Sequence, residues 1–141
     1  MTEGAQTETV EFLQATMGEL NERLGVVFLE ASPERIVATM PVEGNRQPFG
    51  LLHGGASVAL GESLGSCLAA LNAPPDRSAV GIEINATHHR SATSGTVTGV
   101  ATPLNVGRTL VTSEIVVSDE QDRRVCTVRL TCLLRESRQP G

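Results

Sequence analysis

The sequence predicts an α+β fold in which one antiparallel sheet wraps around a single long helix. The segment from His53 to Leu71 consists mainly of Ala, Leu, Ser and Gly, and its apolar residues cover nearly the whole helix circumference. This pattern is typical of a helix buried in the middle of a protein. Two segments rich in strand-forming residues precede it and four follow it. Because a sheet covers only one side of such a helix, we expect a second copy to complete the core, giving a homo-oligomer, either a dimer or a tetramer built from dimers.

The N-terminal part is predicted to supply one surface helix and two strands. Residues 1–8 are polar, and we expect them to be flexible. Apolar residues recur at helical spacing over 9–24, and Gly25 is a plausible stop. Segments 26–32 and 35–42 then have strand composition, separated by a short turn that contains a proline.

The C-terminal half is predicted to be all strand. Pro74 and Pro75 end the long helix, since proline cannot continue one. The strand-forming segments that follow are 79–87, 95–103, 110–117 and 124–134. The last alternates apolar and polar residues, as expected for a strand with one buried face. We expect a single domain over 1–141 with a flexible tail from 136 onward.

Composition excludes several classes of protein. The chain has 141 residues, a net charge of −5, no lysine and 2% aromatic residues. A nucleic-acid-binding surface needs positive charge and stacking rings, so nucleic acid is a poor partner. No apolar run approaches the roughly 18–20 residues that span a bilayer, and no secretory signal is visible. The three cysteines do not form a disulfide framework, which indicates a reduced, cytoplasmic protein.

The negative charge is unevenly distributed along the chain. Residues 1–50 hold eight acids and three arginines, whereas residues 51–141 hold eight of each. No acid lies between Glu83 and Glu114, a stretch that contains two histidines and two arginines. The net charge therefore describes the N-terminal third only.

Glu62 is the first candidate for chemistry. A carboxylate in the middle of an apolar helix costs several kcal/mol to bury in its charged form without a partner. Burial would raise its pKa toward the range of a general base. Ser66 lies one turn later on the same face and could bind the same water or substrate. The alternative is a structural or solvent-exposed carboxylate.

His53, Gly54 and Gly55 directly precede the helix, where free N–H groups and the helix dipole favour an oxyanion. A tight turn that needs glycine is the alternative. Gly54 and Glu62 are about 12 Å apart along a helix and roughly 80° apart around it. Both groups must approach within about 3 Å of the reacting atoms or of the attacking water. If both act on one substrate, they come from different subunits.

The adjacent histidines His88 and His89 do not have the spacing of a metal site. Neighbouring strand residues point to opposite faces, and no Cys or Asp stands nearby at metal-ligand spacing. Arg90 and Arg108 lie within the acid-free stretch and fit a polyanionic ligand, because guanidinium groups bind phosphate well. Ordinary solvated arginines are the alternative.

Several segments together resemble the hotdog-fold acyl-CoA thioesterases. They are NRQPFGLLHGGASVALGESLGS, GIEINATHHRS, PLNVGR and EIVVSDEQDRRVCTVRLT. The resemblance covers about residues 24–134. It is closest to the thioesterases that act on 1,4-dihydroxy-2-naphthoyl-CoA or proofread enterobactin synthesis, within the phenylacetate-pathway-like group. It implies hydrolysis of an acyl-CoA, with an aromatic acyl group favoured over a long aliphatic one, and no metal or redox cofactor.

The resemblance also implies roles for individual residues. The catalytic carboxylate falls on Glu62, as base or nucleophile, and the carbonyl-polarising N–H on Gly54 of the other subunit. The supporting residues are His53, Gln47 and Ser66. The segments implied to contact the substrate and coenzyme A comprise Gly81, His88, His89, Arg90, Ser91, Asn105, Val106, Gly107, Arg108, Thr109 and Leu110.

Two departures from the family pattern stand out. Gly61 occupies a position where close relatives carry alanine, which predicts looser helix packing there. The end of the long helix lacks the aromatic or Met residues that help to shape the acyl pocket in relatives. Two other functions stay open, namely a non-catalytic acyl-CoA sensor and a hotdog hydratase of enoyl thioesters, although the chain lacks the Asp/His dyad expected of a hydratase.

Overall fold

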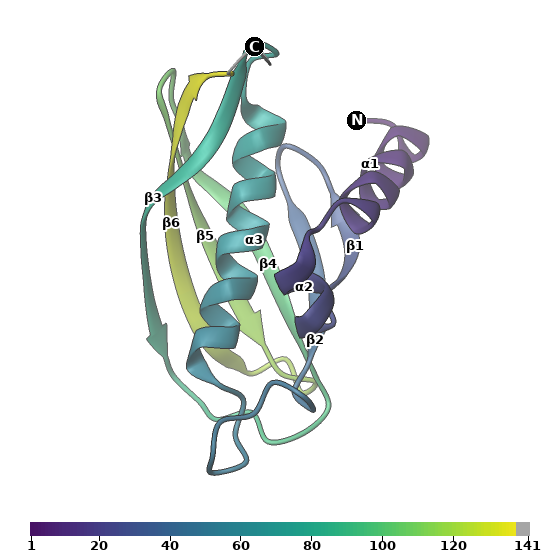
Figure 1. Cartoon of the computed structure of the whole chain (residues 1–141), viewed down its shortest axis with the longest axis vertical. Coiled ribbons are helices and arrows are strands. Elements are labelled where there is room, and N and C mark those ends of the chain that lie inside the picture. Colours follow the sequence, from purple (N-terminus) through teal and green to yellow (C-terminus); the bar gives the residue numbers. More distant parts are fainter. Residues whose placement is uncertain (138–141) are drawn as a thin grey trace.

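A six-stranded antiparallel sheet curves around one long helix in the computed structural model, which describes residues 1–137 (Figure 1). The elements in chain order are α1 (Glu3–Ala15), α2 (Glu19–Leu24), β1 (Val27–Ala31), β2 (Ile36–Pro41), α3 (Gly54–Asn72), β3 (Arg77–His88), β4 (Thr96–Val106), β5 (Leu110–Ser118) and β6 (Arg124–Glu136). The strand order is β1-β2-β4-β5-β6-β3. The predicted α+β fold, with its sheet wrapped around a central helix, is confirmed.

The N-terminal segment differs from the prediction of one helix over 9–24 after a flexible start. Helix α1 begins at Glu3, because the Thr2 hydroxyl accepts a hydrogen bond from the Ala5 N–H at 3.2 Å and caps it. The break before α2 lies at Gly18, whose φ of 83° is one that other residues rarely adopt. Gly25 ends α2 as predicted.

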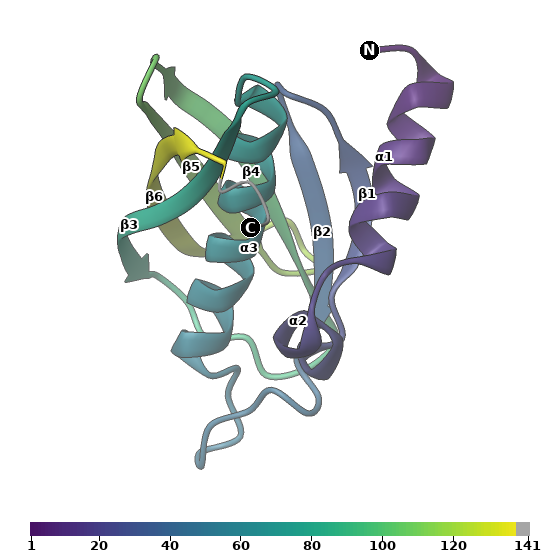
Figure 2. The ribbon, with the colours of Figure 1, turned by 45° about the horizontal axis from the view of Figure 1, so that its top comes forward.

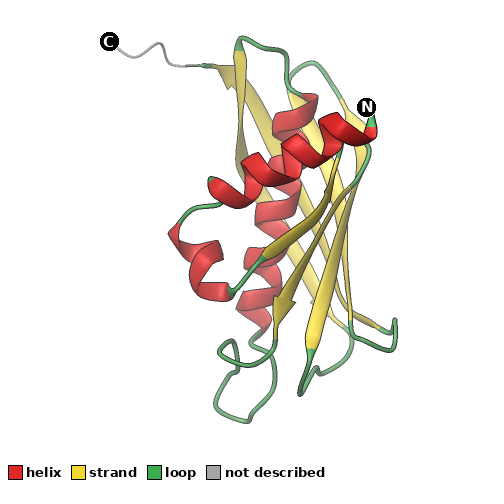
Figure 3. Cartoon of the chain, turned by 90° about the vertical axis from the view of Figure 1, so that its right-hand side faces the viewer, coloured by secondary structure: helices red, strands yellow, loops and turns green. Residues whose placement is uncertain are grey.

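Helix α1 lies against the outermost strand, β1 (Figure 3). The view of Figure 2 shows it apart from α3. The Gln14 amide joins the two elements, donating to the Val26 carbonyl at 3.2 Å and accepting from the Phe28 N–H at 2.9 Å. The expected flexible tail lies mostly outside the described residues. Of that tail, Glu136 ends β6 and the Ser137 N–H donates to the Asp76 carbonyl at 2.9 Å.

The core lies between α3 and the concave face of the sheet. Leu60, Leu64 and Leu68 are fully buried there, and burial of each stabilises the fold by about 1.5–3 kcal/mol. Two glycines let the helix approach closely: a Cβ at Gly61 would lie 2.8 Å from Val128, and one at Gly65 would lie 2.6 Å from Leu130. The looser packing expected at Gly61 is therefore wrong.

Only one side of α3 is buried in the single chain. Eight of its 19 residues are buried, all on the side that faces the sheet, whereas Ala59, Glu62 and Ser66 are half-buried and Ala70 is exposed. By length and mean hydropathy α3 could cross a bilayer, contrary to our prediction that no segment is long and apolar enough. Its packing against the sheet is that of a core helix.

A β-bulge in β3 sets which residues face α3. Gly81 pairs with Cys132 and Glu83 with Thr131, so Ile82 is an extra residue in the strand. Side chains normally alternate between the two faces, and a bulge shifts that alternation by one position. As a result Gly81 and, beyond the bulge, His88 both face α3. The same strand forms one edge of the sheet.

Candidate active site

His53 caps the N-terminus of α3 and leaves one backbone donor free. Its Nδ1 accepts from the Gly55 N–H at 2.8 Å, and its carbonyl accepts from the Ala56 N–H at 2.9 Å. Its own N–H donates to the Asn45 carbonyl at 2.8 Å, which ties the cap to the preceding loop. Within residues 1–137 the Gly54 N–H has no hydrogen-bond partner. It is the position at which a helix favours negative charge.

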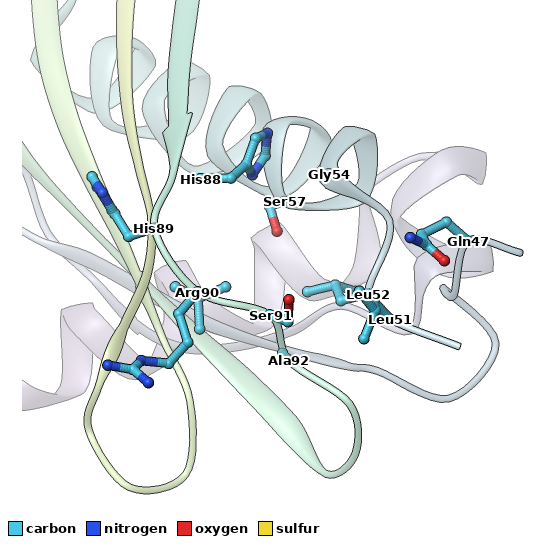
Figure 4. A pocket seen from close by; sticks show the side chains of 11 residues that line it. Gln47, Leu51, Leu52, Gly54, Ser57, His88, His89, Arg90, Ser91 and Ala92 are labelled. Carbon is cyan, nitrogen blue, oxygen red and sulfur yellow. The ribbon is translucent and has the colours of Figure 1, made fainter. Parts of the chain in front are cut away.

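The free Gly54 N–H lies at a cleft of about 300 Å³ between the start of α3, the preceding loop and the end of β3 (Figure 4). The residues that line the cleft are Gln47, Leu51, Leu52, Gly54, Ser57, His88, His89, Arg90, Ser91, Ala92 and Val125. It therefore brings together Gln47 and Gly54 with the segment from His88 to Ser91, as the sequence predicted for parts of one site.

Gln47 is held with its amide oxygen occupied. The oxygen accepts a hydrogen bond from the Phe49 N–H, and the Gln47 N–H donates to the Leu51 carbonyl at 2.7 Å. The amide NH2 group bonds to none of the described residues. A glutamine fixed in this way offers a donor to an oxygen in the cleft.

The two adjacent histidines point in different directions (Figure 4). A Cβ at Gly54 would lie 2.9 Å from Nε2 of His88, so that ring lies directly beside the helix start. His89 Nε2 instead shares a hydrogen bond of 2.8 Å with the Thr127 hydroxyl. Its backbone N–H and that of Arg90 both donate to the Val125 carbonyl, at 2.8 and 3.3 Å, which fixes the strand end that carries the exposed Arg90.

Glu62 lies further along α3, outside this cleft. Its carboxylate contacts Gly81 of β3, and Ser66 and Cys132 are its neighbours. Burial is the main cause of the raised pKa of the Cys132 thiol; a hydrogen bond from Ser66 lowers it and the charge of Glu62 raises it. Ser66 and Glu62 thus both lie near Cys132, as expected for residues one turn apart on the same face of the helix.

Within one chain, Gly54 and Glu62 do not line the same cleft. Glu62 is absent from the lining of the cleft that contains Gly54, and eight residues of helix separate them by about 12 Å. A single chain therefore keeps the two candidate groups apart, one at the start of α3 and one at its middle.

The acid-free stretch of the sequence is also divided in space. Asn105, Val106, Gly107, Arg108, Thr109 and Leu110 surround the turn between β4 and β5, near the C-terminal end of α3. There the Arg108 carbonyl accepts from Arg77 Nη1 at 3.1 Å. Arg90 lies at the opposite end, so a single chain does not bring the two arginines together. Nor is the stretch free of acid in space, because Glu120 accepts from the Thr96 N–H at 3.0 Å.

Comparison with known proteins decides the family. The sequence matches the family "Thioesterase superfamily" over residues 49–126. It is 49% identical over 125 residues to "Proofreading thioesterase EntH" of Cronobacter sakazakii, which covers 87% of this chain and 91% of that protein. The chain belongs to the thioesterase superfamily. It is a thioester hydrolase of the hotdog type.

Solved thioesterase structures agree with this assignment. Thioesterase HI1161 of Haemophilus influenzae superimposes with a TM-score of 0.85 at 38% identity, covering 90% of each chain. A mutant of thioesterase PA1618 of Pseudomonas aeruginosa gives 0.86 at 39% identity, covering 91% of this chain and 94% of that one. A thioesterase protein of Streptococcus pneumoniae solved with coenzyme A shares the fold, with a TM-score of 0.72 at 16% identity over 81% of this chain and 88% of that one.

Some residues that line the cleft of this thioesterase were not predicted from its sequence. Leu51, Leu52, Ala92 and Val125 are apolar and carry no signal of function. Ser57 did carry one, because it is a polar residue on the side of α3 that is otherwise apolar and buried. It is 1% exposed, and its hydroxyl points into the cleft (Figure 4).

The thioesterase shows no metal site in the part of the chain that the structure describes. No three His, Cys, Asp or Glu side chains gather there in a way that could hold an ion. The side chains of His88 and His89 point in different directions and therefore cannot bind one ion together.

Proposed function

We propose that this thioesterase hydrolyses an acyl-CoA in an active site assembled from two copies of the chain. One observation supports this most directly: the chain has a free N–H donor at Gly54 and a carboxylate at Glu62, in two half-sites that one helix cannot bring together. A second chain placed antiparallel along the open side of α3 would bring the Glu62 of one copy to the cleft of the other.

In the proposed reaction the substrate carbonyl lies in the cleft. The Gly54 N–H, at the positive end of the helix dipole, stabilises the negative charge that develops on the carbonyl oxygen. The free NH2 of Gln47 is a second donor beside it. His53 keeps the helix start in place by capping it. These groups act on the electrophile, and none of them needs to exchange a proton.

Glu62 of the other copy acts on the nucleophile. In the general-base form it takes a proton from water, the resulting hydroxide adds to the carbonyl carbon, and the carbon–sulfur bond breaks. The proton then passes to the departing thiolate, giving a carboxylic acid and free coenzyme A. In the nucleophilic form the carboxylate itself adds to the carbonyl carbon, and the carbon–sulfur bond breaks to release the thiolate and leave a mixed anhydride. Water then hydrolyses this anhydride, which restores the Glu62 carboxylate and frees the carboxylic acid, while the thiolate takes up the released proton as coenzyme A. Ser66 positions the water or the substrate in both forms.

The remaining candidate residues are proposed to bind the substrate. Arg90 at the cleft and Arg108 on a second copy suit the phosphates of coenzyme A, and a protein of the same fold was solved with that molecule. We propose an aromatic acyl group, by similarity to EntH-like thioesterases. Phe49 supports an apolar acyl group, since its ring is 87% exposed on the loop that carries Gln47.

Release of thiol from a panel of aromatic and aliphatic acyl-CoA thioesters tests the proposal. We expect Glu62→Ala to lower kcat by at least about 10³-fold, the combined effect of a lost base and lost positioning. Glu114→Ala is the matched control, because that carboxylate is also half-buried but lies on the opposite face of the sheet. Unchanged turnover in Glu62→Ala would contradict the proposed role.

The same assay separates the two other functions considered. A sensor would bind acyl-CoA without releasing thiol from any member of the panel. A hydratase would convert an enoyl thioester to a hydroxyacyl thioester with its carbon–sulfur bond intact, which product analysis detects. Either result would contradict hydrolysis as the main reaction.

A further inference from the structure

The Glu62 carboxylate occupies space that exists only because residue 81 is glycine. A Cβ built at Gly81 would overlap Oε1 of Glu62, and would lie 3.4 Å from its Cδ and 3.5 Å from Leu130 Cδ1. We propose that Gly81 is a positioning residue, whose missing side chain makes the seat for the catalytic carboxylate. This inference rests on the proposed function, in which Glu62 is catalytic.

Backbone conformation does not explain a glycine at this position. The glycines of this chain with positive φ lie in turns and at helix ends, whereas Gly81 is in a strand and is not among them. Alanine would fit the backbone of Gly81 without strain. The constraint is therefore the space in front of it, which the carboxylate fills.

The bulge at Ile82 and the neighbouring strand complete the seat. Because of the bulge, Gly81 faces α3 while the residues after Glu83 keep their own inward positions. Gly81 pairs with Cys132 of β6, whose thiol is buried. The Glu62 carboxylate thus extends from α3 toward the edge strand β3 and its neighbour β6. A carboxylate held in this way has little freedom to move along the sheet and is presented at the open side of the helix.

Two roles for Gly81 make different kinetic predictions. If Gly81 seats Glu62, a methyl group there displaces the carboxylate, and a misplacement of about 1 Å can cost on the order of 10² in rate. We then expect Gly81→Ala to lower kcat by roughly 10- to 100-fold with little change in KM. If Gly81 only contacts the substrate, as the family resemblance implied, the same change should raise KM and leave kcat largely intact.

A shorter carboxylate at position 62 provides the decisive test. Aspartate lacks one methylene, so Glu62→Asp withdraws the carboxylate from Gly81 and lowers kcat on its own. In the Glu62→Asp background the methyl of Gly81→Ala no longer meets the carboxylate and keeps only its ordinary contact with Leu130, so we expect the double variant to match Glu62→Asp within about threefold. Independent effects would instead multiply, and that result would overturn the inference.

Unfolding temperature provides a readout that does not depend on activity. If Gly81→Ala lowers the melting temperature by forcing Glu62 aside, then Glu62→Ala in the same chain should restore it. A melting temperature that stays low in the Glu62→Ala/Gly81→Ala double variant would contradict the proposed contact. This measurement keeps the test meaningful even if Gly81→Ala folds poorly.

Gly99→Ala is the matched control. Gly99 lies on β4, and a Cβ there would lie 2.6 Å from Leu64 Cδ1. Leu64 is on α3, like Glu62, but the contact does not involve the Glu62 carboxylate. We expect it to cost stability while kcat per folded molecule stays unchanged. The two proposals can fail separately: an active Glu62→Ala variant would contradict the proposed function, whereas an inactive Glu62→Ala with a fully active Gly81→Ala would contradict only the role of Gly81.

Discussion

At the scale of single residues, the start of α3 shows how one side chain leaves one donor free. His53 satisfies the second N–H of the helix through Nδ1 and the third through its carbonyl, so the first N–H, that of Gly54, remains available. Helix ends have unpaired donors, and most proteins satisfy them with caps or water. Here the cap leaves the Gly54 N–H unpaired, and this residue lines the cleft.

The cysteine thiols provide a test of the local environment. Burial raises the pKa of Cys67 to about 11, so at pH 8 its thiolate is about 100-fold rarer than that of a thiol with pKa 9. We expect native protein to react with iodoacetamide at Cys67 about 100-fold more slowly than protein unfolded in urea. Peptide mapping by mass spectrometry measures the rate at each cysteine. Equal rates in the two states would contradict the buried, neutral thiol.

The raised pKa also has a consequence for stability. The native state holds the Cys67 proton more tightly than the unfolded chain. The contribution of this thiol to the free energy of unfolding is therefore fully present below pH 9. It decreases as the pH rises from about 9 through about 11, where the native thiol ionises.

Sequence reasoning located the residues with distinctive chemistry and missed those without it. Glu62 was found because a charge interrupts an apolar helix, and its contact with Gly81 became visible only once the two elements were packed. That His88 rather than His89 faces Gly54 depends on the bulge at Ile82. Glycine within a strand, such as Gly81, often accompanies a bulge, but the sequence does not specify where the extra residue lies.

At the scale of elements, the long helix and all six strands were predicted to within a few residues. Their composition is distinctive: the helix is apolar nearly all round, and the strands are rich in Val, Ile and Thr. The N-terminal helix was predicted less well. None of its residues is fully buried, so packing leaves little pattern, and its true start depends on the cap at Thr2 and its break on Gly18.

Close packing of α3 on the sheet is testable through Gly65. A methyl group there would lie 2.6 Å from Leu130 Cδ2 and 2.8 Å from Ser113 Oγ. Overpacking of this kind costs about 1–3 kcal/mol, so we expect Gly65→Ala to lower the free energy of unfolding by that amount in urea titrations.

Gly4→Ala is the control for helix propensity. Nothing lies within 4 Å of a Cβ at Gly4 in α1, and alanine is favoured in a helix by up to about 1 kcal/mol. We expect no loss of stability in Gly4→Ala. A Gly65→Ala variant as stable as Gly4→Ala would show that α3 does not lie as close to β5 and β6 as described.

At the scale of the whole molecule, the two arginines of the acid-free stretch lie at opposite ends of α3. They can act on one coenzyme A only if they come from different copies. We expect Arg90→Gln and Arg108→Gln each to raise KM for an acyl-CoA several-fold, and neither to affect the corresponding N-acetylcysteamine thioester, which lacks the nucleotide and its phosphates. Steady-state kinetics with both substrates measures the difference.

Arg35→Gln is the control for the loss of one positive charge. Arg35 forms an exposed ion pair with Glu30, far from both half-sites, and its loss should leave KM unchanged for both substrates. Equal increases in KM for the two thioesters in Arg90→Gln would contradict a role in binding the nucleotide.

An oligomer is a prediction from the sequence, and the sequence does not describe its arrangement. A helix that is apolar nearly all round predicts that a single sheet cannot cover it, and its half-exposed side agrees with that reasoning. The sequence does not specify how a second copy lies on this side, because the residues there are small and similar to one another.

Complementation between two inactive variants tests the two-copy active site most directly. Glu62→Ala removes the carboxylate. Gly54→Pro removes the N–H donor with a residue that suits the first position of a helix, and it also displaces His88 of the same cleft, whose Nε2 lies 2.9 Å from a Cβ at Gly54. If each site takes Glu62 from one copy and Gly54 from the other, a mixed dimer contains one intact site. Co-refolding the variants at a 1:1 ratio should then restore about a quarter of wild-type activity, since half of the dimers are mixed and each has one of two sites intact. If the mixture forms mixed dimers but stays as inactive as each variant alone, both groups belong to one chain and the proposed site is wrong.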